Sequence, residues 1–136
     1  MTEIDPVFES VRLLVVDTLG RDLDEITRNA HWELDLGGES IDLIDLSFRL
    51  EKHFGVKVRM PGISGMELTM DEHGLLTRET LDRLAAEVPC LDLRDWETRP
   101  FTRPLDLITI GSLTELARTA LEKSEEGKEI VSLPGS

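Results

Sequence analysis

The sequence is short of the residues that several functional classes need. It has one cysteine, Cys90, so no intrachain disulfide can form, and its three histidines show no metal-binding spacing. We interpret these histidines, His31, His53 and His73, as surface or loop residues. There is no tyrosine, and the longest apolar run, Leu13–Val16, is far shorter than the roughly 20 residues that cross a bilayer. We therefore expect neither a bound metal nor insertion into a membrane.

Basic residues are scarce relative to acidic ones. The chain has 15 lysines and arginines against 28 acids, for a formal net charge of −13. This imbalance argues against nucleic acid as a partner, because its phosphates would repel the protein, and it favours partners with basic docking patches. Repulsion between copies of this negatively charged chain favours a monomer. The first residues are acidic where a secretory signal would be basic, so the expected location is the cytoplasm.

Helical spacing and capping residues predict four helices. Asp5-Pro6 begins the first and Gly20 ends it, and a second is expected from Ser40 to Phe54. A third is capped by Thr77, and the last runs from Ser112 to Lys123, with Ser112 and Glu115 forming a capping box.

The predicted organisation is a single domain over residues 1–136. Its bundle comes from residues 5–60 and 106–123, its inserted segment covers 61–105, and 124–136 form a flexible tail. At 136 residues with 40% hydrophobic content, the chain suits one modest core. We interpret Trp32 and Trp96 as packing anchors and not as ligand platforms.

The segment around Ser40 carries the functional signal. Gly37 and Gly38 allow a sharp turn just before the predicted start of the second helix, leaving Ser40 unshielded. A helix start presents free backbone N–H groups and the positive end of the helix dipole, which favour an anion. Residues 33–45 contain five acids and no base. The position therefore suits a serine that carries a phosphate ester.

The same helix is expected to present a docking face. Ser40, Ile44 and Phe48 are spaced by four residues, so they share a side distinct from that of the core leucines. Apolar contacts ringed by acids suit a basic, partly apolar partner. The docking residues that we predict are Asp35, Asp42, Ile44, Asp45 and Phe48.

Three stretches resemble the acyl and peptidyl carrier protein family. Asp35-Leu36-Gly37-Gly38-Glu39-Ser40-Ile41 resembles its phosphopantetheine attachment motif, usually Asp-Leu-Gly-x-Asp-Ser-Leu. Glu51-x-x-Phe54-Gly55-Val56 is similar to the end of its second helix, and Thr109-Ile110-Gly111-Ser112-Leu113 to the start of its last. The resemblance implies an all-α, four-helix acyl-carrier-like bundle with an inserted loop/helix segment.

The resemblance also implies a site and a cofactor. A 4′-phosphopantetheine arm would be attached to Ser40, with Gly38, Glu39 and Ile41 completing the attachment motif. Glu39 replaces the usual Asp, which is the better N-cap, so we expect Ser40 to share the capping role. The insertion departs further from the family and resembles specialised stand-alone carriers with an enlarged loop.

The implied function is tethering without catalysis. A phosphopantetheinyl transferase would install the arm, and acyl-activating ligases or synthases of fatty-acid, lipid or polyketide biosynthesis would use the carried thioester. Two alternatives stay open: an aminoacyl or peptidyl carrier, and a non-loaded docking or regulatory module. Ser40 could also be a simple helix N-cap. A hydrolase nucleophile is disfavoured, since the motif lacks the second glycine of a nucleophile elbow and no strand precedes it.

Overall fold

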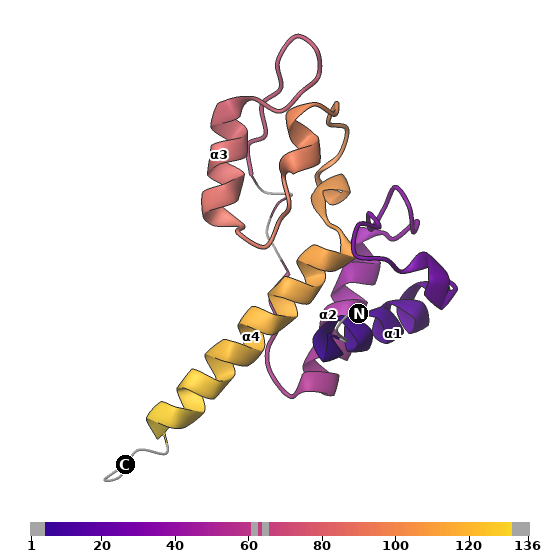
Figure 1. Ribbon diagram of the computed structural model, residues 1–136, viewed down its shortest axis with the longest axis vertical. Coiled ribbons are helices and arrows are strands. Elements are labelled where there is room, and N and C mark those ends of the chain that lie inside the picture. The colour runs from indigo at the N-terminus through magenta and orange to yellow at the C-terminus, as the bar shows by residue number, and fades with distance from the viewer. Residues whose placement is uncertain (1–4, 61–62, 64–65, 132–136) are drawn as a thin grey trace.

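The structure is a computed structural model that describes the backbone of residues 5–60, 63 and 66–131, with side chains as far as residue 124. Within these residues the chain is helical, with isolated bridges in place of strands, so the all-α prediction is confirmed (Figure 1). Short 3₁₀ turns in the described part of the chain include Leu23–Glu25, Arg94–Glu97 and Pro104–Leu107. The α-helices are α1 (Pro6–Leu19), α2 (Ser40–Phe54), α3 (Arg78–Glu87) and α4 (Ile110–Val131).

Local capping fixes both ends of α1 as the sequence predicts. The Asp5 carboxylate accepts hydrogen bonds from the amides of Val7 and Phe8, at 3.1 and 3.3 Å. Proline follows at the first helical position, where its missing N–H costs nothing. At the other end Gly20 adopts a left-handed conformation, with φ of 66°, and its amide donates to the carbonyl of Val16 at 2.8 Å.

The bundle forms where α1 packs against α2 and α4. Val11 and Val15 on α1 are fully buried, as are Leu46 and Leu50 on α2. Burying each such side chain contributes about 1.5–3 kcal/mol relative to leaving it exposed. This packing against α1 fixes the position of α2 in the bundle.

The inserted segment contains α3 and occupies the upper part of Figure 1, beyond the N-terminal end of α4. The Thr77 hydroxyl caps α3 by accepting from the Thr80 amide at 3.2 Å, as predicted. Trp96 is 1% exposed and packs edge-on against Phe101, with ring centroids 5.9 Å apart. Buried residues of this segment and of the bundle form one hydrophobic cluster.

His31 lies in the loop after α1, as one of the two predicted alternatives allows, and it is not a surface residue. The side chain is buried at the boundary between bundle and insertion, edge-on to Trp96. Its Nδ1 donates to the Asp106 carbonyl oxygen at 2.8 Å, which leaves Nε2 to accept from Arg99 at 3.3 Å. The loop after α1 is also fixed to the segment before α4, since the Trp32 amide donates to the carbonyl of Ile108.

The start of α4 differs from the prediction. The helix begins at Ile110, and Thr109 is its cap: the Thr109 hydroxyl accepts from the Ser112 amide at 3.1 Å, and the Ser112 hydroxyl accepts from the Thr109 amide at 2.9 Å. The predicted box between Ser112 and Glu115 is therefore wrong. The helix continues to Val131, so residues 124–131 of the predicted flexible tail are helical; residues 132–136 lie outside the described part.

Acid should weaken the fold through Asp5, whose carboxylate also pairs with Arg28 at 2.7 Å and Arg118 at 2.6 Å. The hydrogen bond from Arg28, followed by those from the Phe8 amide and Arg118, lowers the pKa of Asp5 to about 2. Because this folded-state pKa lies below the unfolded value of about 3.9, the stabilisation is present above pH 4 and is lost as pH falls toward 2.

The variant Asp5→Asn keeps a capping oxygen but removes the charge. We expect it to lower the free energy of unfolding by about 1–2 kcal/mol at pH 7 and to flatten its pH dependence between about pH 4 and 2. Urea denaturation at several pH values measures both effects. Asp24→Asn, at an exposed acid, is the control; equal pH dependence in the two variants would contradict the assignment.

Candidate functional site

Ser40 is the first residue of α2 and is exposed. The expectation that it shares the capping role is wrong. Glu39 is the N-cap residue, and its amide donates to the Asp42 carboxylate at 2.9 Å. Among the hydrogen bonds of the described residues, none involves the Ser40 hydroxyl. The hydroxyl is therefore free to react at the surface.

The indole of Trp32 determines the path of the chain just before Ser40. Its Nε1 donates to the carbonyl of Glu39 at 3.0 Å, while its own carbonyl accepts from the Gly38 amide at 2.8 Å. A Cβ added at Gly38 would lie 2.5 Å from Trp32 Cε2, which is a collision. Gly38 is thus required for close approach of the indole, a reason that the sequence analysis did not foresee.

The preceding glycine has a different role. Gly37 adopts a left-handed conformation with φ of 69°, which most other residues reach only with strain. Just before it, Leu36 is buried at 2% exposure, and its carbonyl accepts from Arg21 Nε at 3.0 Å. The turn therefore has a buried anchor on one side and the Ser40 hydroxyl on the other.

An apolar cavity of about 490 Å³ lies beside Ser40. One wall comes from Leu43 and Ile44 of α2, and the other comes from Met60, the inserted segment and the chain that leads from it into α4. Glu33 and Arg103 form an ion pair in the lining. The residues of the second wall are Met60, Ile63, Pro104, Leu105 and Ile108.

The outer face of α2 is apolar in its centre. Ile41, Ile44 and Phe48 are 66%, 55% and 64% exposed. They lie at positions i, i+3 and i+7, so the structure adds Ile41 to the stripe that the spacing predicted for the other two. We call these three residues the α2 apolar stripe.

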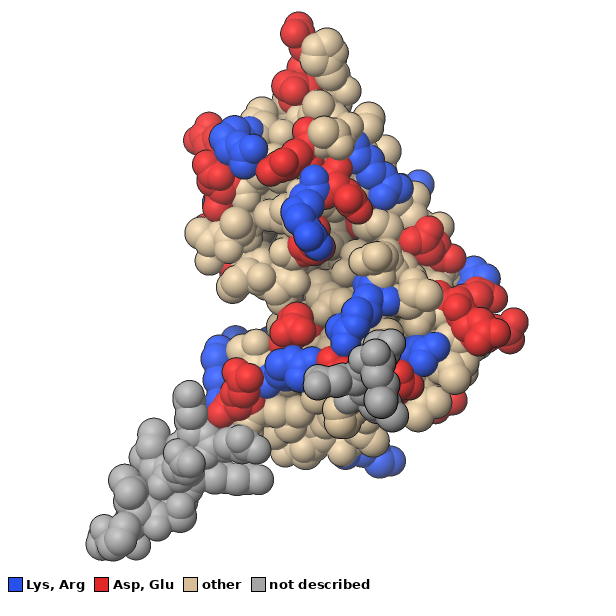
Figure 2. All heavy atoms as spheres, viewed as in Figure 1, with Lys and Arg blue, Asp and Glu red and all other residues tan. Residues whose placement is uncertain are grey.

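Each of the predicted acidic docking residues has a local partner. The Asp35 carboxylate accepts from the His31 amide at 2.7 Å, and that of Asp42 caps the helix start. Asp45 pairs with Arg49 at 3.3 Å, one turn along α2. All three therefore have local partners, and their part in docking stays a prediction. On the face drawn in Figure 2, basic side chains are likewise interspersed with acidic ones.

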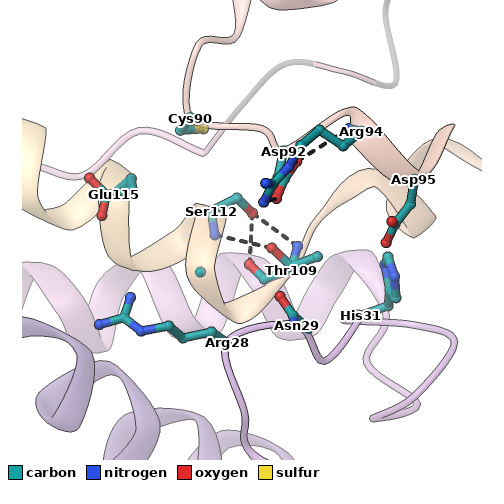
Figure 3. A pocket seen from close by; sticks show the side chains of 11 residues that line it. Arg28, Asn29, His31, Cys90, Asp92, Arg94, Asp95, Thr109, Ser112 and Glu115 are labelled. Carbon is teal, nitrogen blue, oxygen red and sulfur yellow. Dashed lines mark hydrogen bonds and ion pairs between the residues drawn. The ribbon is translucent and has the colours of Figure 1, made fainter. Parts of the chain in front are cut away.

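A second cavity, of about 280 Å³, lies where the loop after α1, the insertion and α4 meet (Figure 3). Several of its polar groups bond to one another: Arg94 pairs with Asp92 at 2.6 Å, and Ser112 bonds to Thr109. Burial raises the pKa of the Cys90 thiol, which makes its reactive thiolate form rarer. This cavity offers no activated nucleophile.

Other site classes find no support in the described part of the chain. No group of three or more His, Cys, Asp and Glu residues is arranged there to hold a metal ion. No helix among the described residues has the length and apolar character to cross a membrane.

Comparison with known proteins finds similarity in the segment that contains Ser40. The family described as "Phosphopantetheine attachment site" matches residues 9–62, which contain α1, the glycine turn, Ser40 and α2. A curated acyl carrier protein from Petrotoga mobilis (strain DSM 10674 / SJ95) is 43% identical over 54 residues. Residues 9–62 are thus similar to a phosphopantetheine attachment site and to an acyl carrier protein. We call residues 9–62 the carrier segment.

The carrier segment is only part of the molecule. The match to the Petrotoga protein covers 40% of this chain and 64% of that protein. It supports a covalently attached 4′-phosphopantetheine as the cofactor. The matched range ends where the inserted segment begins, so α3 and α4 lie outside it.

Within the carrier segment, Gly38→Ala should lower the free energy of unfolding by about 1–3 kcal/mol, because the new methyl group collides with Trp32. Trp32→Leu on the same background removes the colliding ring. We expect the double variant to lose less stability than the sum of the two single variants, as measured by urea denaturation. Strict additivity would show that Gly38 and the indole are not in contact.

Proposed function

We propose that this protein is an acyl carrier and that Ser40 is the residue to which 4′-phosphopantetheine is attached. The single observation that carries the proposal is the Ser40 hydroxyl, exposed at the first residue of α2 and without a hydrogen bond among the described residues. It lies inside a segment that matches the attachment family. The chain itself would perform no catalysis.

The residues around Ser40 fit such a group. The start of α2 favours the negative phosphate by about 0.3–1 kcal/mol through its dipole, and Gly38 and Glu39 set the turn that exposes the serine. Ile41 lies on the exposed side of the helix, next to the attachment point. When attached, the arm supplies a terminal thiol that carries an acyl group as a thioester.

The cavity beside Ser40 favours acyl over aminoacyl cargo. Its walls are mostly aliphatic, and each buried CH₂ group of a chain contributes about 0.8 kcal/mol. A charged aminoacyl group would gain nothing from such walls. An aminoacyl or peptidyl carrier is therefore the less favoured variant.

The partners that we propose are a phosphopantetheinyl transferase and acyl-activating ligases or synthases with basic docking patches. The net charge of −13 supports such partners and a monomeric carrier. The insertion supplies surface that short carriers lack, which favours a specialised, stand-alone type in fatty-acid, lipid or polyketide biosynthesis. The cytoplasm stays the predicted location.

The alternative of a non-loaded docking module is weakened by Ser40. Among the described residues, the Ser40 hydroxyl makes no hydrogen bond that would explain the serine as a cap, and Glu39 is the N-cap residue. A module that is never loaded would have no use for an exposed hydroxyl at this turn. Loading is therefore the experiment that separates the two functions.

We expect the apo protein, incubated with coenzyme A and a promiscuous phosphopantetheinyl transferase, to gain the mass of one arm. Ser40→Ala should gain none, while Ser10→Ala, at a half-buried serine of α1, should be loaded like the unaltered protein. Intact-mass spectrometry reads the result. Absence of any gain with several transferases would favour the non-loaded module.

The α2 apolar stripe should matter for docking and little for stability. Phe48→Ala is expected to raise KM for the carrier in the loading reaction roughly tenfold, since exposed aromatic anchors dominate such interfaces. The unfolding midpoint should stay nearly unchanged. Leu13→Ala removes a similarly exposed apolar side chain from α1 and serves as the control. Equal KM values for the two variants would contradict docking through α2.

A further inference from the structure

Arg103 brings a positive charge to the cavity beside Ser40. It comes from the inserted segment, at the N-cap of the 3₁₀ turn Pro104–Leu107, and forms an ion pair with Glu33. Among the described residues that line this cavity, Arg103 is the one base and Glu33 the one acid. The Arg103 side chain is 70% exposed, whereas that of Glu33 is 22% exposed.

The surroundings of Ser40 are otherwise negative. Residues 33–45 contain five acids and no base. Arg49 is committed to Asp45 and Arg21 to the Leu36 carbonyl and Glu25. A phosphodiester on Ser40 would add another negative charge to this rim, so a nearby cation has a clear electrostatic use.

We propose that Arg103 binds the phosphate of the arm attached to Ser40, exchanging Glu33 for the phosphate. This inference rests on the proposed function, because it requires the phosphodiester. It assigns the inserted segment a positioning residue for the cofactor. No part of the carrier segment supplies such a cation at this cavity.

The exchange is physically favourable. The Arg103 side of the ion pair is 70% exposed and that of Glu33 is 22% exposed, so the pair is not fully buried, which limits the free energy lost when Arg103 leaves Glu33. A guanidinium matches phosphate oxygens with two parallel hydrogen bonds, and the helix start adds backbone donors on the other side. The phosphate would then lie between the first turn of α2 and Arg103.

Binding of the phosphate by Arg103 would also affect the neighbouring residues that line the cavity. The Arg103 amide donates to the Asp106 carboxylate at 3.3 Å, and Thr102 donates to the same carboxylate. Pro104 and Leu105, which follow directly, line the cavity. Loading of Ser40 should therefore order this part of the insertion against the arm.

The test compares Arg103→Gln with Arg78→Gln in the full chain. Arg78 is a matched control, because it lies in the insertion, is 67% exposed and pairs with Glu97 at 3.4 Å. For each protein, the ³¹P chemical shift of the holo form and the unfolding midpoints of apo and holo forms are measured. Arg103→Lys keeps the positive charge but lacks the two parallel N–H donors of the guanidinium, and it is included as a milder variant.

We expect Arg103→Gln to shift the ³¹P signal of the holo form. The difference in unfolding midpoint, holo form minus apo form, should be lower in this variant than in the unaltered protein by about 3 °C or more. Arg78→Gln should change neither value, and Arg103→Lys should lie between. Salt at about 1 M should reduce the difference between unaltered protein and Arg103→Gln, since it screens the contact.

Identical values for Arg103→Gln and Arg78→Gln would overturn the inference while leaving the proposed function intact. If Arg103→Gln fails to fold, the same comparison applies to Arg103→Lys. Failure of the unaltered protein to gain the arm's mass would overturn both the proposed function and this inference. The mass spectrum therefore separates the two failures.

Discussion

The presentation of Ser40 depends on the contact between the Trp32 indole and the backbone at Gly38 and Glu39. The indole hydrogen bond holds the Glu39 carbonyl, and the missing side chain of Gly38 gives the ring its space. Trp32 itself is fully buried and is fixed through its backbone amide to Ile108. The start of α2 is thereby tied to the core, which leaves the serine hydroxyl exposed at a defined position.

Two parts of the chain supply different features around this contact. The carrier segment supplies the attachment turn and the exposed stripe on α2. The inserted segment supplies Arg103 and much of the second cavity wall beside Ser40. Under the proposed function, the chemistry would belong to partner enzymes and the arm, whereas the chain would fix where the arm begins and what lies next to it.

Features governed by neighbouring residues could be predicted from the sequence. The ends of α1 follow from Asp5 and Gly20, and the start of α3 follows from Thr77, because caps act within one turn. Ser40 at the start of α2 followed from the same reasoning. Long-range contacts could not be predicted: Arg103 reaches Glu33 across 70 positions, and burial of His31 depends on Trp96. The start of α4 was misplaced because Thr109, and not Ser112, is its cap.

The most direct measurement of the central claim is tandem mass spectrometry of the protein purified from its own host. The account predicts that the peptide containing Ser40 carries a phosphopantetheine arm, at least partly as an acyl thioester, and that the modification maps to that serine. An unmodified Ser40 in actively growing cells, or an arm attached to another residue, would contradict it.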